Sequence, residues 1–121
     1  MAHNRPERVA ELLHAEIARI LREDVSDPRL VACSVTRVRV SPDLRAARVH
    51  VLPLGGEGDA ADMLRGLKAA SSYIRRQVGR TLLLKYLPSL DFVLDEGLEE
   101  AVRMTSLLGR LEAEEKEGTE R

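Results

Sequence analysis

The spacing of the apolar residues changes along the chain, and this change limits the folds that the chain can adopt. Between Val9 and Leu21 they recur every three or four residues, which is typical of one buried face of a helix. Asn4 is a suitable N-cap, and Pro6 fits the first helical turn. The Ser-Asp-Pro sequence at 26–28 ends the helix, because the residue before a proline avoids helical geometry.

Two segments that follow have alternating apolar residues, which is typical of half-buried strands. Strict alternation in residues 34–40 places Thr36, Val38 and Val40 on one face and Val35, Arg37 and Arg39 on the other. Residues 47–54 alternate likewise, with Ala47, Val49 and Val51 opposite Arg48, His50 and Leu52. The Ser-Pro-Asp-Leu sequence between them favours a turn, so the two strands should form an antiparallel hairpin. Its outer face would carry Arg37, Arg39, Arg48 and His50.

A second helix and a third strand complete the predicted fold. After a glycine-rich loop at 55–58, Asp59 can cap a helix whose inward stripe holds Leu64, Leu67, Ser71, Ile74 and Val78. Pro88 precedes a short strand in which Leu90, Phe92 and Leu94 alternate, and Gly97 opens a last helix. The simplest arrangement is an α+β domain, in which helices cover one face of a three-stranded sheet and the other face stays wet and basic. One domain would span residues 1–111, followed by an acidic, disordered tail at 112–121.

Charge is distributed unevenly in a chain whose formal net charge is −1. Residues 63–90 contain no acid and six basic residues, namely Arg65, Lys68, Arg75, Arg76, Arg80 and Lys85. Helical spacing brings most of them, with Ser72, onto one face as a row about 22 Å long, given about 1.5 Å per residue. A surface sorted in this way is typical of proteins that bind a polyanion, most often a nucleic acid. The alternative is a solvated helix face that lacks acids.

No set of residues for catalysis or metal binding can be assembled from the sequence. Cys33 is expected to be a small buried apolar residue, and His3, His14 and His50 are expected on the surface. The sequence therefore predicts a protein that is not an enzyme and has no metal or cofactor. It shows no signal pattern and no apolar stretch of membrane-spanning length, which indicates a cytoplasmic protein.

Aromatic residues are few, and this bears on how RNA could be recognised. Phe92 alternates into the core, Tyr86 is expected to be half-buried beside Pro88, and Tyr73 is expected to fill core or groove space. Modules that read single-stranded RNA by sequence usually stack bases on exposed rings. The sequence thus favours binding through phosphates and RNA shape, which should weaken strongly as the salt concentration rises.

Several stretches, taken together, resemble the ribosome-binding factor A family. They are RPERVAELLHAEIARIL, DPRL, VTRVRVSPDLRAARVHV and YIRRQVGRTLLLKYLPSLDFVLDEGLEEAVRM, and they cover about residues 5–111 in the family's order. SPDLRAARVHV followed by LPSLDFVLDEG is the specific combination. The resemblance implies a type II KH-like fold of order αββααβ with a further C-terminal helix. It also implies that the protein binds the immature 30S ribosomal subunit through 16S rRNA and acts in late rRNA processing. Such a factor would be important in the cold, would catalyse no reaction and would be released by an assembly GTPase.

One position departs from the family pattern. KH domains commonly clamp nucleic acid with a GxxG loop, whereas this family has an Ala-x-Gly kink between two helices, which here falls at Ala70, Ser71 and Ser72. Ser72 stands where the glycine is expected and cannot adopt a positive φ as readily. A serine can nevertheless bond back to a carbonyl of the preceding turn and bend a helix. We therefore expect a kink that persists but is shallower.

The residues predicted to contact RNA form two groups. The first group is Arg65, Lys68, Ser72, Arg75, Arg76, Arg80 and Lys85, and the second is Arg37, Arg39, Arg45 and Arg48. The chain is thus interpreted as a monomeric, non-enzymatic assembly factor for the small ribosomal subunit. The alternative is a protein–protein adaptor whose basic faces bind an acidic partner. A sequence-specific DNA-binding protein is disfavoured, because no helix-turn-helix pattern is present.

Overall fold

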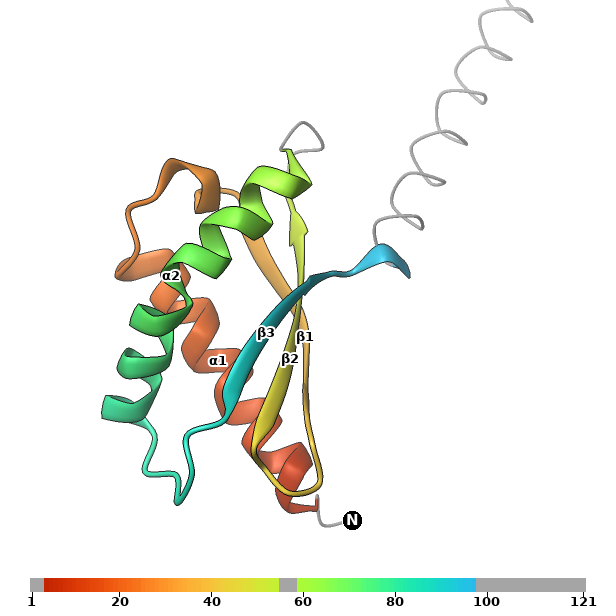
Figure 1. Ribbon diagram of the computed structural model, residues 1–121, viewed down its shortest axis with the longest axis vertical. Helices are drawn as coiled ribbons and strands as arrows, with labels where there is room; N and C mark the ends of the chain where they lie inside the picture. Colours follow the sequence, from red (N-terminus) through yellow and green to blue (C-terminus); the bar gives the residue numbers. More distant parts are fainter. Residues whose placement is uncertain (1–3, 55–58, 98–121) are drawn as a thin grey trace, which may run out of the picture.

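The computed structural model describes residues 4–54 and 59–97 (Figure 1). In chain order the elements are helix α1 (Arg5–Glu23), the short 3-10 helix η1 (Pro28–Leu30), strands β1 (Cys33–Val40) and β2 (Ala46–Pro53), helix α2 (Ala60–Thr81) and strand β3 (Ser89–Leu94). The predicted C-terminal helix and the acidic tail at 112–121 lie outside the described residues.

Helix α1 begins as predicted and ends a few residues early. The side chain of Asn4 accepts a hydrogen bond from the backbone N–H of Glu7 at 2.9 Å, which satisfies one of the free donors at the helix start. The helix ends at Glu23, ahead of the proline. Asp27 instead caps η1, where its carboxylate accepts from the N–H of Arg29 at 2.9 Å. Pro28 therefore starts a new helical turn rather than ending α1 itself.

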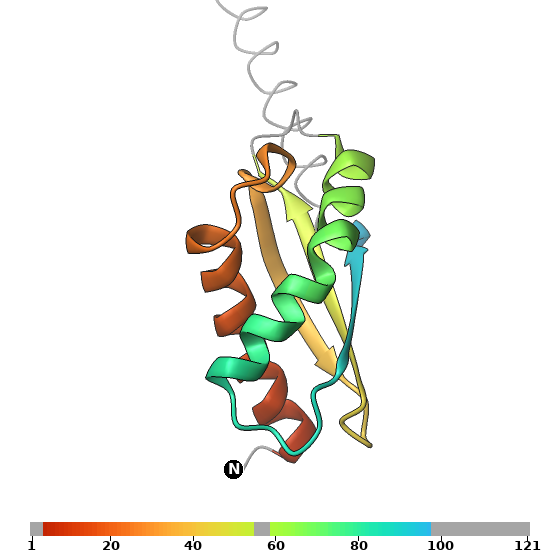
Figure 2. The ribbon, with the colours of Figure 1, turned by 60° about the vertical axis from the view of Figure 1, so that its left-hand side comes forward.

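The three strands form one mixed sheet in the order β1-β2-β3. Strands β1 and β2 are antiparallel, as predicted for the hairpin, and β3 runs parallel to β2 at the other edge. Both long helices lie on the same face of the sheet, with α1 over β1 and α2 toward β3 (Figures 1 and 2). The α+β arrangement with helices on one face is thus confirmed. The described residues between β2 and β3 contain one helix, α2, where the family resemblance implied two.

The core lies between the two helices and the sheet. Apart from Pro88, which lies just before β3, the largest fully buried side chains come from α1, β2 and α2: Leu13, Ile17, Ile20, Val49, Val51, Leu67, Ile74 and Val78. Burying these apolar surfaces against one another supplies the main driving force for holding the helices on the sheet. The opposite side of α2 is left free to carry charge.

Strand β1 departs from strict alternation at one residue. Val35 pairs with Val51 and Arg37 pairs with His50, so Thr36 is an extra residue in β1. This bulge turns both Val35 and Val38 into the core, and the prediction that Val35 shares the solvent face with Arg37 is wrong. The prediction for Leu52 is also wrong, because this side chain is buried. Thr36 itself donates a hydrogen bond to Oδ2 of Asp95 at 2.5 Å.

The turn between β1 and β2 is built from short polar bonds. The hydroxyl of Ser41 donates to Oδ1 of Asp43 at 2.6 Å, and the backbone N–H of Arg45 donates to the same oxygen at 3.1 Å. Leu44 has a φ of 63°, which is rare for a residue with a branched side chain. These contacts confirm the predicted turn and fix the backbone on which Arg45 is carried.

Candidate nucleic-acid interface

Helix α2 carries the row of basic residues on its outer side. Its inward side buries Met63, Gly66, Leu67, Ile74 and Val78. The predicted contact residues of α2 all lie exposed on the other side: Arg65, Lys68, Ser72, Arg75, Arg76 and Arg80. Asp59 begins the helix, as predicted, by accepting from the N–H of Ala61 at 2.9 Å. The helical spacing therefore does bring these cations onto one surface.

The cations of this row are not equally available to a ligand. Arg65 forms an ion pair with Asp62 on the preceding turn. Arg75 donates from Nη2 to the carbonyl of Leu87 at 2.8 Å and from Nε to the carbonyl of Pro88 at 3.1 Å. Arg75 thus holds the segment that leads into β3, and its guanidinium is engaged in the fold.

Three cations of the row have no partner among the described residues. Within residues 4–54 and 59–97, neither a hydrogen bond nor an ion pair involves the side chains of Lys68, Arg76 and Arg80. An exposed cation without a partner can give all its donors to a phosphate. We define Lys68, Arg76 and Arg80 as the free basic row.

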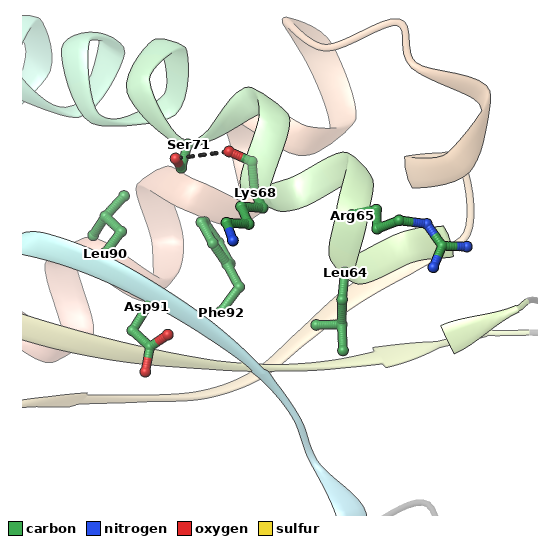
Figure 3. Close-up of a pocket in the computed structure, with 7 residues that line it drawn as sticks. All are labelled: Leu64, Arg65, Lys68, Ser71, Leu90, Asp91 and Phe92. Carbon is green, nitrogen blue, oxygen red and sulfur yellow. Dashed lines mark hydrogen bonds between the residues drawn. The ribbon is translucent and has the colours of Figure 1, made fainter. Parts of the chain in front are cut away.

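A groove runs beside the first half of α2, between this helix and β3 (Figure 3). Its volume is about 450 Å³. Leu64, Leu90 and Phe92 give it an apolar floor, and the side chain of Lys68 extends over it while Arg65 turns away. Asp91 also lines the groove on the strand side, but its carboxylate points away from α2 (Figure 3). The groove can therefore accept an apolar or planar group, with a cation at its rim.

Helix α2 changes direction midway along its length, near Ser71 (Figures 1 and 3). The hydroxyl of Ser71 donates to the carbonyl of Lys68, one turn earlier, at 2.9 Å. Back-bonding of this kind is a known cause of helix bending. The bond is made by Ser71, whereas Ser72, at the position expected to hold glycine, lies exposed within the basic row.

The second basic group is divided between two places. Arg37, Arg39 and Arg48 are exposed on the sheet face opposite the helices, where Arg39 pairs with Arg48 in the strand register. Nε of Arg48 also lies 3.7 Å from Oδ2 of Asp91 on β3. Arg45 lies apart from them, on the turn between β1 and β2. The outer sheet face is thus basic, as predicted, but it is partly neutralised by an acid.

His50 is less exposed than predicted. It lies on the outer sheet face among the arginines, yet its Nε2 atom is buried without a hydrogen-bond partner in the part of the chain that the structure describes. Burial, followed by the nearby charges of Arg37 and other arginines, lowers the pKa of His50. The lowered pKa favours the neutral imidazole at physiological pH. His50 thus lies on the outer face, as predicted, but is half-buried there.

The remaining candidate chemical groups serve the fold. Nε2 of His14 lies 3.0 Å from the carbonyl oxygen of Val35, so His14 is half-buried rather than free on the surface. Burial raises the pKa of the Cys33 thiol to about 11, which keeps it protonated at neutral pH. In the described ranges no three histidine, cysteine, aspartate or glutamate side chains come together as metal ligands. Nor does either range contain a helix long and apolar enough to cross a membrane.

Two predicted cations meet at Tyr86, which the sequence did not indicate as a contact residue. The ring is half-exposed, in agreement with the sequence. The guanidinium carbon of Arg45 lies 5.8 Å from the ring centroid, and Nζ of Lys85 lies 5.5 Å from it. Lys85 and Tyr86 are adjacent in the sequence, but Arg45 is brought to them only by the fold. The spacing of residues in the sequence could not predict this cluster of an exposed ring and two cations.

The fold and its surface together define a class of protein. It is a small α+β domain with exposed cations along one helix that have no partner within residues 4–54 and 59–97, which suits the backbone of a polyanion. The chain belongs to the ribosome-binding factor A family, whose family model matches residues 5–108. It is similar to ribosome-binding factor A of Moorella thermoacetica, with 43% identity over 113 residues covering 92% of this chain and 93% of the relative. The factor of Acetivibrio thermocellus is 40% identical, covering 93% and 92%.

Solved structures of the family have the same fold. The crystal structure of ribosome-binding factor A from Thermus thermophilus has a TM-score of 0.67 and 25% identity, covering 74% of this chain and 93% of that one. The solution structure of a Thermotoga maritima protein described as a putative ribosome binding factor A has a TM-score of 0.60 and 30% identity, covering 79% and 94%. A homology model of the Thermus factor, fitted into a cryo-EM map of a 30S–RbfA complex, has a TM-score of 0.53 and 29% identity, covering 68% and 90%.

Proposed function

We propose that this protein is a non-enzymatic assembly factor that binds the immature 30S ribosomal subunit through 16S rRNA and promotes its late processing. The observation that carries the proposal is the free basic row on α2, formed by Lys68, Arg76 and Arg80. Membership of the ribosome-binding factor A family supports it, as does the similar Thermus factor fitted into a 30S complex. The proposed partner would place its action in the cytoplasm.

The chemistry of the row suits RNA better than a protein partner. Phosphates recur along an RNA strand, and the cations of the row recur along the helix. Arginine binds phosphate through a planar fork of donors, so Arg76 and Arg80 can each make two parallel bonds. Arg65 and Arg75 already have partners within the chain, so we assign them lesser roles.

The finer features of the family are part of the same proposal. We take the domain as type II KH-like, with the two halves of α2 on either side of Ser71 corresponding to two helices of that fold. The back-bond of Ser71 would then replace a glycine kink. We also propose that the protein is a monomer and that an assembly GTPase releases it from the 30S subunit.

Reversing charge in the free basic row tests the function. We expect Arg76→Glu with Arg80→Glu to abolish co-sedimentation with immature 30S particles, because each change replaces a phosphate donor by a repelling carboxylate. The melting temperature should stay nearly unchanged, since both side chains are exposed and neither bonds to another residue in the part of the chain that the structure describes.

A matched control distinguishes an effect of this surface from an effect of the protein's net charge. Arg8 and Arg22 lie exposed on α1, outside both predicted groups, and the double change Arg8→Glu with Arg22→Glu alters the net charge equally. This control should still co-sediment. Equal loss in both double variants, or retained binding in the Arg76/Arg80 variant, would show that the row is not the interface.

The alternative function, an adaptor for an acidic protein, is distinguished by the same assay. If RNA is the partner, co-sedimentation is lost once the RNA of the particle is digested, and the isolated RNA competes for binding. If an acidic protein is the partner, binding survives digestion and the RNA does not compete.

A further inference from the structure

The segment between α2 and β3, residues 82–88, is held firmly against the domain. Leu82, Leu84 and Leu87 pack against the core, and Leu87 also contacts Gly79 of α2. The guanidinium of Arg75 binds two successive carbonyls at the end of the segment. The backbone of this segment is therefore fixed by contacts on its inner side.

The same segment places two large apolar side chains outward. Leu83 is 99% exposed and Tyr86 is 50% exposed. Leu82, Leu84 and Leu87 in the same segment are partly buried against the core, which sets the backbone that carries Leu83 and Tyr86. A tyrosine ring held on a fixed backbone loses little freedom when a ligand packs against it, because its side chain has only two main torsions.

Two cations lie over the Tyr86 ring, so a base can stack on it where one of these side chains moves away. Arg45 and Lys85 lie 5.8 Å and 5.5 Å from the ring centroid, near the outer limit for a cation–π contact. Both side chains are exposed and can move, while the backbone of Arg45 is fixed. Its carbonyl accepts from the N–H of Ser89 at 2.9 Å and from the Ser89 hydroxyl at 3.3 Å. The ring and the two cations are thus held together by the turn and by the start of β3.

We propose that Tyr86 stacks on an unpaired RNA base, with Arg45 and Lys85 binding the phosphates on either side of that nucleotide. An exposed ring flanked by cations is the arrangement by which proteins bind single-stranded nucleic acid. Bases in a duplex are already stacked on one another and cannot reach such a ring. This inference rests on the proposed function, and it adds that the RNA offers a single-stranded segment at this end of the domain.

The test compares single-stranded and double-stranded RNA. We expect Tyr86→Ala to weaken binding of the full chain to an unstructured purine oligonucleotide by roughly tenfold, within the usual range for loss of one stacked base. Tyr86→Phe and Tyr86→Trp should retain the affinity, because both keep a ring. Binding to a duplex of the same sequence should not change, and the dependence of log Kd on log salt should keep its slope, since no cation is removed.

A spectroscopic signal tests the same contact directly. The chain has two tyrosines and no tryptophan, so in a Tyr73→Phe background Tyr86 is the only tyrosine and its emission can be excited selectively. Stacking of a base should quench its emission as the oligonucleotide is added. An unchanged emission at saturation would overturn the inference.

Two further outcomes separate this inference from the proposed function. If Tyr86→Ala binds single strands as the wild type does, while the wild type still co-sediments with immature 30S particles, the stacking contact is wrong and the function stands. If Tyr86→Ala weakens single-stranded and duplex RNA equally, the residue supports the surface without stacking, and the inference is again overturned.

Discussion

Two adjacent arginines of α2 have different tasks. Both Arg75 and Arg76 are exposed, and both belong to the predicted contact group. Arg75, however, donates to the carbonyls of Leu87 and Pro88, whereas Arg76 has no hydrogen bond or ion pair with any described residue. One arginine therefore holds the fold together, and its neighbour is available for binding.

This difference can be measured with two single variants. Arg75→Ala should lower the free energy of unfolding by about 1–3 kcal/mol, since two hydrogen bonds are lost at about 0.5–1.5 kcal/mol each. Arg76→Ala should change it by less than about 0.5 kcal/mol, as is usual for a surface change. Urea denaturation of both variants checks the prediction. Equal stabilities would mean that the Arg75 bonds contribute nothing.

The sequence predicted where these arginines lie but not what they do. Helical spacing is a local property, so it placed the basic side chains of α2 on the outer face correctly. The carbonyls that bind Arg75 lie twelve and thirteen residues later, beyond the end of the helix. Likewise, Arg45 meets Tyr86 only because the turn and the segment before β3 are adjacent in space. The spacing of residues along one helix or strand cannot predict contacts between segments that are distant in the sequence.

At the scale of the element, α2 contains two glycines in different surroundings. A Cβ added at Gly66 would lie 3.2 Å from Cβ and Nε of Arg29 and from Cδ2 of Leu30. Arg29 cannot move away freely, since its guanidinium binds the carboxylate of Asp27 at 2.7 Å. A Cβ added at Gly79 would meet only the end of the Leu87 side chain, at 3.2 Å. Gly66 thus permits a close approach between α2 and η1.

Replacing each glycine by alanine should therefore have opposite effects. Alanine in a helix is favoured over glycine by about 1 kcal/mol at an interior position and by less near the end. Gly79→Ala should raise the free energy of unfolding by about 0.5 kcal/mol, because a terminal methyl can shift. Gly66→Ala should lower it, because η1 must be displaced. Chemical denaturation gives both values, and a stabilising Gly66→Ala would contradict the close-approach argument.

The sequence predicted the ends of the strands to within one residue, but it did not predict correctly which residues of β1 face the core. The structure begins β1 one residue earlier than predicted, at Cys33, and shifts β2 by one residue to Ala46–Pro53. The phase of β1 failed because Thr36 is an extra residue opposite β2. Its hydroxyl bonds to Asp95, which lies 59 residues away in the sequence. A bulge of this kind depends on strand pairing, and a single strand's alternation cannot reveal it.

For the whole molecule, several carboxyl groups link stability to pH. The pKa of each is lowered in the folded state, chiefly by one side-chain hydrogen bond: from Arg19 to Glu16, from Arg29 to Asp27, from Ser41 to Asp43, and from Arg65 to Asp62. A carboxyl group with a lower pKa in the folded state stabilises the fold above its unfolded pKa, which is about 4. That stabilisation is lost as the pH falls through the folded value.

The free energy of unfolding should begin to fall below about pH 6.5, where the unfolded chain protonates His50 more readily than the fold does, and should fall further below about pH 4 as these carboxyl groups take up protons. Glu16 is the most buried of these acids, so Glu16→Gln should be less stable than the wild type at pH 7. The variant should lose less stability than the wild type between pH 5 and pH 3. Urea denaturation at the three pH values checks this, and parallel losses would exclude Glu16 as a contributor.

The bulge in β1 also affects how the chain meets other copies of itself. Strand β1 lies at one end of the described sheet, and open strand edges can pair with another chain and start aggregation. Here the extra residue breaks the even spacing of hydrogen-bonding groups, and the imidazole of His14 already contacts the carbonyl of Val35. A second chain could extend the sheet at this edge only by straightening the bulge and displacing that imidazole. The irregularity that brings Val35 into the core therefore also hinders pairing with another chain at this edge of the sheet.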